Sequence, residues 1–591
     1  MHPPRREPPT WRLRPADAAQ VSRLARGANL PELVARLLVQ RGRAEPDEAT
    51  RHLDAGLAGL HDPGLLPGMQ AACERLARAL RDGETILVHG DYDVDGVCGT
   101  ALLVELFRLV GARAVPYIPN RLSDGYSFGA HSVAEAVARE AGLVVSVDNG
   151  TSAGATIAEL AERGIDTLVT DHHEPPRGAP LPAATALVNP KLAGSTYPFR
   201  ELCGSGVAFK LAWGLCQAQS GARRVREDLR AFLTDAMAFV ALATVCDVVP
   251  LVDENRVLAR HGLRALEASR RVGLRALLAR CELGGRTLNA EDVAFKIGPR
   301  LNAAGRLGSA NRALDLLTAS DEGCARDLAG ELDALNVERR RVEAEILEAA
   351  VRAAAPWAAS DEHPVLVLAG QGWHQGVVGI VASRLVQRFG KPALVIGLAG
   401  DEGRGSARSV PGFDVLSALH GGAEHMLRYG GHAQAAGCEV RADAIDALRA
   451  AVNARARELA PGGAEPLALE IDAEVGLESM GPELMGHLDR LEPFGQDNPQ
   501  PVFLSRDARL AEPPRAVGAE RTHLLVRVRR GERVLKAMAF GAGARLAELR
   551  QGTPLHLVYS PRWNTFRGVR DLELVLHDFT HGDVRLAGGG T

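Results

Sequence analysis

Three short clusters of aspartate and histidine follow hydrophobic runs in the first third of the chain. They read HGDYDVDG (89–96), SVDNG (146–150) and TDHH (170–173), and each begins where a predicted strand ends. The carboxyl ends of parallel strands form the crevice in which doubly wound α/β sheets hold ligands. Carboxylate oxygens together with an imidazole suit Mn²⁺ or Mg²⁺, and two such ions about 4 Å apart are the usual apparatus for phosphoryl hydrolysis. The clusters therefore predict a two-metal hydrolytic centre.

The first cluster is the densest in possible ligands. An extended segment directs every second side chain to the same side, and four ligand-capable residues have that spacing: His89, Asp91, Asp93 and Asp95. A single acidic turn before glycine is usually no more than an exposed turn. Three such clusters, each after a hydrophobic strand, favour a metal centre over that alternative.

The elements around the clusters alternate between strand and helix. Strands are predicted at 85–89, 114–118, 143–147 and 166–170. The helices between them are predicted at 97–110, 132–140 and 154–163. Such a βαβ series predicts a parallel sheet.

The rest of the chain changes its pattern twice. A charged stretch from Asp321 to about Arg352 indicates one long connecting helix. A second α/β unit begins near Pro364 and ends at a Pro/Gly-rich linker, 461–466. Beyond Pro499, short alternating strands predict a small barrel of the oligonucleotide-binding type.

Composition sets the bounds on function. The formal net charge of −4 gives no strongly basic field, so local basic patches must carry any case for a nucleic-acid partner. The eight cysteines form no C-x-x-C pair, which favours reduced thiols and gives no zinc signature. The N-terminal MHPPRREPPTWRLRP lacks the apolar core of a signal peptide, and we expect no apolar stretch that approaches the length of a membrane span. We therefore expect a soluble, cytoplasmic protein without a membrane partner.

The metal clusters resemble those of the DHH phosphoesterase superfamily, whose namesake motif stands here as Asp171-His172-His173. The resemblance implies a set of metal ligands: Asp93, Asp95, Asp148, His172 and Asp247. It further implies that Asp148 bridges the two ions, with Asp91 and His89 as additional ligands. His173 and Asp171 are expected to orient His172 or to contact phosphate.

Five further motifs make the chain similar to the RecJ family of bacterial single-stranded-DNA-specific exonucleases. They are IGPRLNAAGRLGSA (297–310), GWHQGVVGIVASRL (372–385), RGSARS (404–409), GGHAQAAG (430–437) and LEPFGQDNP (491–499). The resemblance implies 5′-to-3′ hydrolysis of single-stranded DNA to 5′-mononucleotides, with two Mn²⁺ or Mg²⁺ ions. It also implies work in recombination and repair beside a single-strand-binding protein and a RecQ-type helicase.

The same resemblance divides the chain into five expected parts. They are an N-terminal helical cap (1–70), a DHH catalytic domain with a parallel sheet (71–320), a connector helix (321–360), a DHHA1-type α/β substrate-binding domain (361–465), and an OB-like single-strand-binding β-barrel with its lead-in segment (466–591).

The resemblance also places residues on the DNA. Arg121, Ser406 and Arg408 are expected to form a pocket for the 5′-phosphate end, with RGSARS as a loop that also supplies Ser409. His432 is expected to contact the substrate phosphate, although GGHAQAAG could instead serve close packing of a helix on a strand. We expect three more residues to line the strand path, with structural salt bridges as the alternative: Arg300, Asn302 and Arg306.

The predicted barrel carries basic residues interleaved with Trp563 and Phe566, a pattern suited to stacking single strands. They are Arg527, Arg529, Arg530, Arg533, Lys536, Arg562, Arg567 and Arg570. Two other functions stay open on the sequence. A phosphoesterase for pyrophosphate or short oligonucleotides would not need the barrel, and a catalytically dead DNA-binding scaffold would have lost metal ligands that are all present here.

Overall fold

The computed structural model describes residues 10–121, 124, 128–176, 178–358, 360–460, 468–566, 569–582, 584 and 586. Its chain forms two compact units. The barrel unit consists of Met1–Leu60, Pro250–Arg260 and Leu467–Thr591, and the sheet unit consists of His61–Val249 and His261–Pro466. The chain therefore passes from one unit to the other four times.

A five-stranded parallel sheet carries the three metal clusters. Its strands, in the spatial order β3-β2-β4-β5-β6, are β3 (Arg113–Tyr117), β2 (Thr85–His89), β4 (Ala141–Val147), β5 (Asp166–Thr170) and β6 (Ala186–Val188). The predicted parallel sheet is confirmed. Because the strands are parallel, the residues that follow β2, β4 and β5 meet at one edge.

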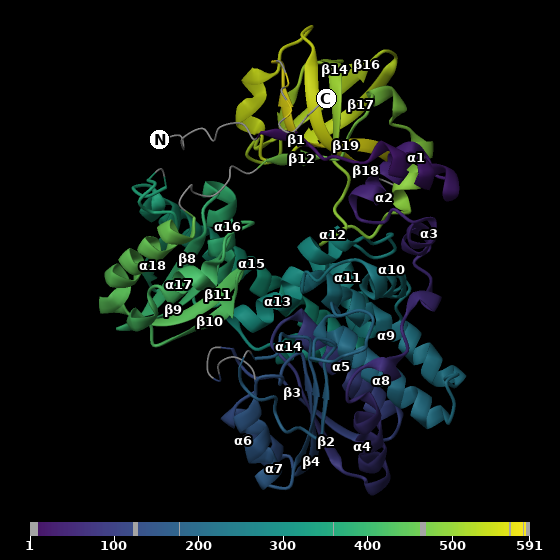
Figure 1. Ribbon diagram of the computed structural model, residues 1–591, viewed down its shortest axis with the longest axis vertical. Helices are drawn as coiled ribbons and strands as arrows, with labels where there is room; N and C mark the ends of the chain where they lie inside the picture. The colour runs from purple at the N-terminus through teal and green to yellow at the C-terminus, as the bar shows by residue number, and fades with distance from the viewer. Residues whose placement is uncertain are drawn as a thin grey trace. The chain divides into compact units, whose positions relative to one another are not determined.

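Helices cover both faces of this sheet (Figure 1). One face packs on α6 (Ala130–Ala138) and α7 (Gly154–Glu162), through a core that includes Leu87, Val144 and Val169. The other side holds α4 (Met69–Asp82), α5 (Val94–Leu109), α8 (Gly204–Ser220) and α9 (Glu227–Cys246).

Helix α9 has the length and hydropathy of a membrane span, contrary to the sequence prediction that no segment would. Most of its apolar stretch is buried inside the protein. The helix packs against α5 and α8. Helix α9 is therefore a core helix of the protein. Such a helix is hydrophobic on most sides because other parts of the protein surround it.

A helical layer follows α9. It contains α10 (Asp253–Glu267), α11 (Val272–Arg280), α12 (Ala290–Asp292), a π-helical turn (Val293–Ile297), α13 (Gly298–Leu307), α14 (Asn311–Leu317) and α15 (Glu322–Ala354). Helix α15 has 33 residues and is about 50 Å long. Its first half packs on α11, α13 and α14, and its second half packs on the next sheet. It is the predicted connector.

The second sheet has the spatial order β10-β11-β9-β8-β7. Its elements are β7 (Leu366–Gln371), α16 (Val378–Phe389), β8 (Ala393–Ala399), β9 (Glu402–Arg408), α17 (Val415–His420), β10 (Arg428–His432), β11 (Ala435–Arg441) and α18 (Ile445–Leu459). RGSARS was predicted as a loop, but most of it lies in β9, which pairs with both β8 and β11. The small residues are needed there, because a Cβ on Gly405 would lie 2.7 Å from Cys438 Sγ.

The barrel unit closes a sheet on itself. The strands are β13 (Ala473–Glu474), β14 (Phe503–Leu510), β15 (Arg515–Val517), β16 (His523–Arg530), β17 (Arg533–Ala539), β18 (Leu555–Phe566) and β19 (Val569–Thr580). The order β14-β18-β19-β17-β16 returns to β14 through the pairs Arg509–Arg529 and Leu510–Val528. The closed five-stranded sheet confirms the predicted OB-like barrel.

The N-terminal helices share the core of this barrel. They are α1 (Ala18–Gly27), α2 (Glu32–Gln40) and α3 (Pro46–Asp54), and α19 (Pro482–Asp489) joins them. Upstream, β1 (Trp11–Leu13) pairs with β12 (Leu469–Ile471), and Trp11 Nε1 donates to Asp578 Oδ2 at 2.8 Å. The segment expected as a separate cap thus packs with the C-terminal part of the chain.

Arg256 ties the short segment Pro250–Arg260 into the barrel unit. Its side chain is 1% exposed, and its guanidinium donates to the carbonyl oxygens of His52, Leu491 and Arg490 at 2.7–2.8 Å. Burial lowers the pKa of Arg256 to about 9. The first carbonyl of LEPFGQDNP, that of Leu491, therefore binds the guanidinium of Arg256, which lies more than 200 residues earlier in the sequence.

Candidate active site

The first cluster folds into a tight turn that begins α5. Asp93 is the N-cap, and its Oδ1 accepts from the backbone N–H groups of Asp95 and Gly96 at 2.9 and 3.2 Å. A Cβ on Gly96 would lie 2.4 Å from the backbone nitrogen of Asp91, so glycine is required at this position. The turn places Asp91 beside Asp93 in one ligand group, whereas Asp95 lies in a second group with His172 and Asp247.

Asp95 is held by the start of α8. Its Oδ2 accepts from Gly204 N at 2.7 Å, and its Oδ1 accepts from Ser205 N at 2.6 Å. Ser205 Oγ also donates to the Asp95 carbonyl at 2.6 Å. Backbone N–H groups at a helix N-terminus stabilise a carboxylate. The sequence analysis missed Gly204 and Ser205, whose only signal is a Gly-Ser-Gly run at the start of a helix.

Asp148 stands in the left-handed region, with φ of 63°. Its backbone N–H donates to Thr170 O at 2.9 Å, which ties the second cluster to the third. A Cβ on Gly204 would lie 2.6 Å from the Asp148 Cβ, so α8 can approach this carboxylate only through a glycine. A left-handed backbone at a residue other than glycine costs about 1–3 kcal/mol. At Asp148 the surrounding contacts compensate for this cost and fix the position of the carboxylate.

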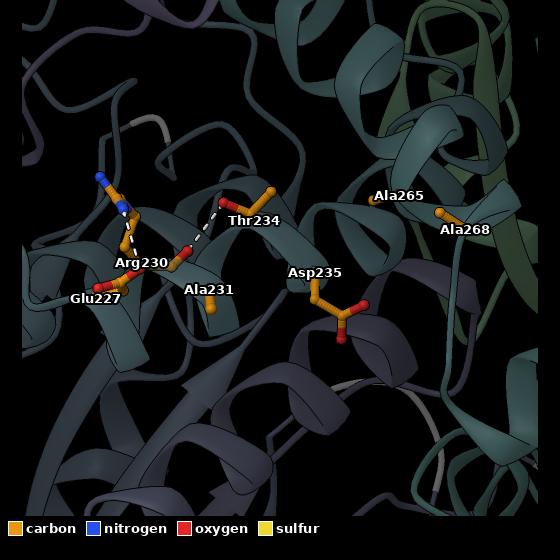
Figure 2. Close-up of a pocket in the computed structure, with 7 residues that line it drawn as sticks. All are labelled: Glu227, Arg230, Ala231, Thr234, Asp235, Ala265 and Ala268. Atoms are coloured by element: carbon orange, nitrogen blue, oxygen red, sulfur yellow. Dashed lines mark hydrogen bonds and ion pairs between the residues drawn. The ribbon is translucent and has the colours of Figure 1, made fainter.

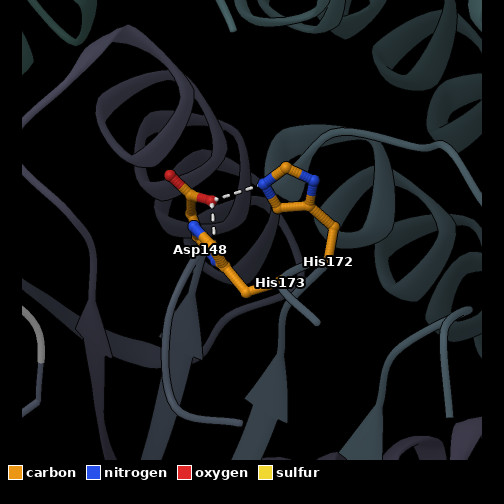
Figure 3. A group of neighbouring side chains, drawn as sticks. All are labelled: Asp148, His172 and His173. Atoms are coloured by element: carbon orange, nitrogen blue, oxygen red, sulfur yellow. Dashed lines mark ion pairs between the residues drawn. The ribbon is translucent and has the colours of Figure 1, made fainter. Parts of the chain in front are cut away.

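The two histidines of the third cluster face Asp148 (Figure 3). Its Oδ1 lies 3.2 Å from His172 Nε2 and 3.9 Å from His173 Nδ1. Asp247, the C-cap of α9, adds an oxygen 3.6 Å from His172 Nε2. Burial lowers the pKa of His172 to about 4, so its imidazole is neutral at pH 7 and keeps a lone pair for a metal.

Asp171 shapes the loop rather than entering the ligand cluster. Its carboxylate accepts from the backbone N–H groups of His172, His173 and Thr151, and from His173 Nδ1 at 2.7 Å. Although Asp171 is buried, its hydrogen bond with His173 holds its pKa well below the usual range. These contacts hold the loop that carries His172 and His173.

Three groups of side chains have ligand atoms close enough to share an ion. The groups are Asp91, Asp93 and Asp148; Asp95, His172 and Asp247; and Asp148, His172 and His173. Asp148 belongs to two of them, which suits a bridging carboxylate.

The electrostatics of these groups fit bound cations. Burial, and then the charges of neighbouring aspartates, raise the pKa values of Asp93, Asp148 and Asp247, and raise that of Asp91 to about 7. Asp91 Oδ1 and Asp148 Oδ1 are buried and have no hydrogen-bond partner among the described residues. Buried carboxylates without counterions are costly, and divalent cations would satisfy them.

His89 stands apart from these groups. Its Nε2 is 2.8 Å from Ser132 Oγ, and its ring packs against Phe128 and Tyr117. Burial lowers its pKa to about 3. The structure therefore places His89 in a buried polar network at the start of the metal loop, the turn of residues 90–96 that carries Asp91, Asp93 and Asp95.

Three arginines gather near the start of α16. Burial, and then the neighbouring charge of Arg121, lower the pKa of Arg306 to about 10 and lower that of Arg408. Arg306 Nη1 donates to Gly376 O at 3.2 Å, and Arg121 lies over the Tyr92 ring at 4.8 Å. None of the three makes an ion pair with a carboxylate of a described residue. Mutually repelling arginines without counterions predict an anion site.

Ser406 joins this arginine cluster. It shares one face of β9 with Arg408, and α16 approaches that face through Gly379, whose Cβ would lie 3.4 Å from Ser406 Cβ. The helix N-terminus adds further N–H donors for an anion.

The other predicted DNA contacts have structural partners. Arg300 Nε donates to Asp333 Oδ1 at 2.9 Å, and Asn302 Oδ1 accepts from Val94 N at 3.2 Å. Ser409 Oγ donates to Phe413 O at 2.7 Å. His432 is exposed at the end of β10. Arg300 thus makes the salt bridge that the sequence left as an alternative, and Asn302 supports the metal loop.

The basic residues of the barrel are mostly paired. Lys536 and Arg562 both bind Glu573, and Arg570 binds Asp489 while covering the Trp563 ring at 4.2 Å. Arg567 and the Phe566 side chain lie outside the described residues.

Asn189 is a further polar residue of this site that the sequence analysis missed. Asn189 is fully buried, and its amide donates to Thr151 Oγ1 and to the His173 carbonyl. Its Oδ1 accepts from the backbone N–H of Lys191 at 2.8 Å. Asn189 thereby joins three loops at the sheet edge.

A groove elsewhere in the sheet unit lacks such chemistry. It lies between α9 and the end of α10, with a volume of about 400 Å³. Figure 2 shows its lining residues, Glu227, Arg230, Ala231, Thr234, Asp235, Ala265 and Ala268. Arg230 pairs with Glu227 at 3.9 Å, and no metal-ligand group from the described residues lies there.

Family models match three parts of the chain. The DHH family, N-terminal domain, matches residues 85–244, the DHHA1 domain matches residues 362–458, and the RecJ OB domain matches residues 471–578. The order of these matches agrees with the sheet, the second sheet and the barrel.

Curated relatives align over nearly the whole chain. The single-stranded-DNA-specific exonuclease RecJ of Bacillus subtilis is 34% identical over 573 residues, which cover 96% of this chain and 70% of that protein. The RecJ of Dickeya dadantii is 38% identical over 93% of this chain and 96% of that protein. The crystal structure of Thermus thermophilus RecJ in complex with Mn²⁺ has a TM-score of 0.82 and 31% identity, covering 98% of this chain and 81% of that chain. The Mg²⁺ complex has a TM-score of 0.75 and 29% identity.

Proposed function

Because this chain belongs to the RecJ family of single-stranded-DNA-specific exonucleases, we propose that it hydrolyses single-stranded DNA from the 5′ end to 5′-mononucleotides. The observation that carries the proposal is the sharing of Asp148 by two adjacent ligand groups. A carboxylate in that position suits a two-metal phosphodiesterase.

The residues present would hold two divalent ions, Mn²⁺ or Mg²⁺. Asp91, Asp93 and Asp148 would hold one, and Asp95, His172 and Asp247 would hold the other. Asp148 would serve this second ion as well, because its Oδ1 lies 3.2 Å from His172 Nε2. When bound, such ions supply Lewis acidity and activate water for in-line attack. The chain supplies geometry: α8 fixes Asp95, and Asp171 fixes the loop that carries His172. His89 completes the support as part of the polar network at the start of the metal loop.

The 5′-to-3′ direction rests on the arginine cluster. Arg121, Arg306, Arg408 and Ser406 offer a preformed site for a terminal phosphate at the start of α16. A 5′-phosphate bound there would place the first phosphodiester toward the carboxylates, because α13, which carries Arg306, contacts the aspartate turn through the hydrogen bond from Val94 N to Asn302 Oδ1 at 3.2 Å. Ser409 and Asn302 would maintain the surrounding backbone, and His432 would approach the phosphate from the β10–β11 hairpin.

The expected domain roles follow from this arrangement. Catalysis would reside in residues 71–320, phosphate recognition in 361–465 with the connector 321–360, and strand binding in 466–591. The helices of 1–70 would stabilise the barrel, because they share its core. Work in repair and recombination in the cytoplasm, beside a single-strand-binding protein and a RecQ-type helicase, follows from the family rather than from any described contact.

The test is digestion of 5′- and 3′-labelled single-stranded and duplex DNA with Mn²⁺ or Mg²⁺, beside Asp148→Asn. Asparagine tolerates the left-handed backbone, so the variant removes the charge and keeps the fold. We expect metal-dependent release of mononucleotides from 5′ ends of single strands, lost in the variant. Turnover of only pyrophosphate or very short oligomers would indicate a small-substrate phosphoesterase. Binding without cleavage would indicate a scaffold.

A further inference from the structure

Tyr92 stands between two candidate metal ligands, Asp91 and Asp93, and none of the predicted site residues includes it. The two aspartates share one ligand group with Asp148, whereas the half-buried tyrosine ring lies under the side chain of Arg121. Carboxylates hold a divalent ion without the help of an aromatic ring. The place of this ring in the metal loop therefore requires another explanation.

The backbone of Tyr92 is packed against α13. A Cβ on Gly305 would lie 2.3 Å from the Tyr92 carbonyl oxygen and 3.4 Å from the Tyr92 Cβ, so only a glycine allows this approach. The same helix binds the loop through Asn302 Oδ1, which accepts from Val94 N at 3.2 Å. The next residue of the helix is Arg306, a member of the arginine cluster. The first atoms of the Tyr92 side chain are thus fixed relative to both the metal ligands and that cluster.

The ring of Tyr92 holds the guanidinium of Arg121. The central carbon of the guanidinium lies over the ring, 4.8 Å from its centroid. A guanidinium within about 6 Å of a ring centroid is attracted by the negative face of the ring. This attraction uses none of the five N–H donors of the arginine. The donors of Arg121 therefore remain available for an anion.

All three arginines of the cluster are held by neutral groups. Arg306 Nη1 donates to the Gly376 carbonyl at 3.2 Å, and Arg408 Nη1 donates to the Ala407 carbonyl at 2.8 Å. Arg121 has the aromatic ring in the corresponding role. A carboxylate would hold an arginine more strongly, but it would also compete with a bound phosphate. Neutral supports keep three like charges close together and leave their charge for a ligand.

We propose that Tyr92 is a positioning residue whose ring holds the Arg121 guanidinium in place to bind the 5′-terminal phosphate of the DNA. The inference rests on the proposed function, because it concerns the terminal-phosphate site of the same reaction. The Cα atoms of Asp91 and Asp93 are each about 3.8 Å from that of Tyr92. One residue would thereby fix the terminal-phosphate site relative to the metal ligands.

The experiment measures equilibrium binding of 3′-labelled single-stranded DNA by fluorescence anisotropy, with EDTA present so that no strand is cleaved. Strands with a 5′-phosphate and with a 5′-hydroxyl are compared. Tyr92→Leu should weaken binding of the 5′-phosphorylated strand by about 3- to 30-fold, the range for one cation–π contact. Binding of the 5′-hydroxyl strand should stay within 2-fold of wild type. Tyr92→Phe keeps the ring and should bind both strands as the wild type does.

A double-variant cycle tests whether the ring acts through Arg121. Arg121→Met should weaken binding of the 5′-phosphorylated strand at least as much as Tyr92→Leu. The variant Tyr92→Leu/Arg121→Met should bind within 2-fold of Arg121→Met alone, and additive losses would overturn the proposal. Trp357→Leu is the matched control, because it removes a ring that lies under Arg449 at 4.5 Å in the second sheet. It should change neither affinity by more than 2-fold.

Mn²⁺ binding separates positioning from general damage to the metal loop. By isothermal titration calorimetry, Tyr92→Leu should bind Mn²⁺ within 3-fold of wild type. A parallel loss of Mn²⁺ affinity, or equal weakening of both strands, would make Tyr92 a structural residue of the loop and overturn the proposal. Thermal unfolding shows whether each variant is folded. If Tyr92→Leu is not, Tyr92→Met carries the test, because its unbranched side chain adapts to irregular spaces.

The remaining outcomes also decide. Equal affinity of the wild-type protein for the two strands would mean that it has no terminal-phosphate site, which overturns the proposal. Equal losses in Tyr92→Phe and Tyr92→Leu would assign the effect to the hydroxyl group rather than to the ring, and would overturn it as well. Absence of cleavage by the wild-type protein with Mn²⁺, while the difference between the strands persists, would overturn the proposed function alone. The two failures are therefore distinguishable.

Discussion

The metal centre and the barrel surface are both rich in charged side chains, but their charges are arranged in opposite ways. At the sheet edge, Asp91, Asp93 and Asp148 crowd together, and burial and mutual repulsion raise their pKa values. In the barrel, Glu573 is equally buried but accepts from Lys536 and Arg562 at 2.8 and 2.7 Å. Despite its burial, those hydrogen bonds hold the pKa of Glu573 below its ordinary value.

The clustered aspartates pair with no lysine or arginine of the described residues and could bind a cationic ligand. The paired charges of the barrel already neutralise one another and stabilise the fold. A protein tolerates buried like charges where binding energy from a ligand compensates for them, and such clusters concentrate at functional sites. Paired charges already have their partners and offer less to a substrate. The arginine cluster near α16 resembles the metal centre in this respect, with the sign reversed.

The largest effect is expected from neutralising the shared carboxylate. Asp148→Asn should lower exonuclease turnover by at least about 10³-fold, or ~4 kcal/mol, because both ligand groups lose an oxygen charge. Mn²⁺ binding by isothermal titration calorimetry should weaken in parallel. Turnover within 10-fold of wild type would mean that Asp148 does not bridge the ions.

A smaller effect is expected in the arginine cluster. Arg408→Met should raise KM for 5′-phosphorylated DNA by about 10- to 100-fold, the range for one charge-assisted contact of about 1.5–3 kcal/mol. Arg404→Met changes an arginine on the same face of β9 that already pairs with Glu439 at 3.3 Å, and should have little effect. Assays with 5′-phosphate and 5′-hydroxyl ends check the assignment, since Arg408→Met should erase any preference between them. Equal losses in both variants would contradict it.

The barrel should respond in stability rather than in chemistry. Glu573→Gln removes the countercharge of Lys536 and Arg562, and should lower the free energy of unfolding by about 1–3 kcal/mol. Urea denaturation, with the exposed Glu532→Gln as control, measures this loss. Turnover at saturating DNA should stay within 2-fold of wild type. A large fall in kcat with unchanged stability would show that this ion-pair network serves catalysis.

The smallest expected effect is a pH dependence of the metal-free protein. The folded pKa of Asp91 is about 7, because of burial and the Asp93 charge, whereas an unfolded aspartate titrates near 3.9. Between these values the folded state binds more protons, so the free energy of unfolding falls as pH rises. Lowering the pH from 8 to 6 should raise the thermal midpoint by about 1 °C, because the unfolding entropy of so long a chain is large. Asp91→Asn should flatten this slope, and Mn²⁺ should remove it. A midpoint that falls over the same range would refute the sign.

The sequence could predict that the candidate metal ligands would lie together, because they follow directly from strand ends. Asp93, Asp148 and His172 come after hydrophobic runs, and parallel strands bring such residues together whatever their loops do in detail. It could not show Gly204 or Asn189. The need for these residues arises only when α8 or β6 is packed against the clusters, and spacing along the chain does not report that contact.

The strand at RGSARS was not predicted, and the surface that the N-terminal helices cover could not be predicted, for a related reason. RGSARS has the glycine and serine content of a loop, and intrinsic preference disfavours it as a strand. Its neighbours in the sheet leave no room for larger residues at Gly405, so tertiary packing overrides preference. The leucines of the N-terminal helices showed an apolar face, but amphipathicity does not identify the surface that the face covers.

The four passages of the chain between its two units restrict how this protein can be divided. Residues 250–260 lie in the interior of the sequence, yet Arg256 is secured by carbonyls from both ends of it. A cut at the linker near 461–466 would leave part of the barrel's own interior with the other fragment. The barrel unit therefore cannot be transferred to another protein as one continuous segment. Gene fusion or domain grafting would have to transfer three separate stretches of sequence at once. Such an arrangement favours inheritance of the whole chain as one piece.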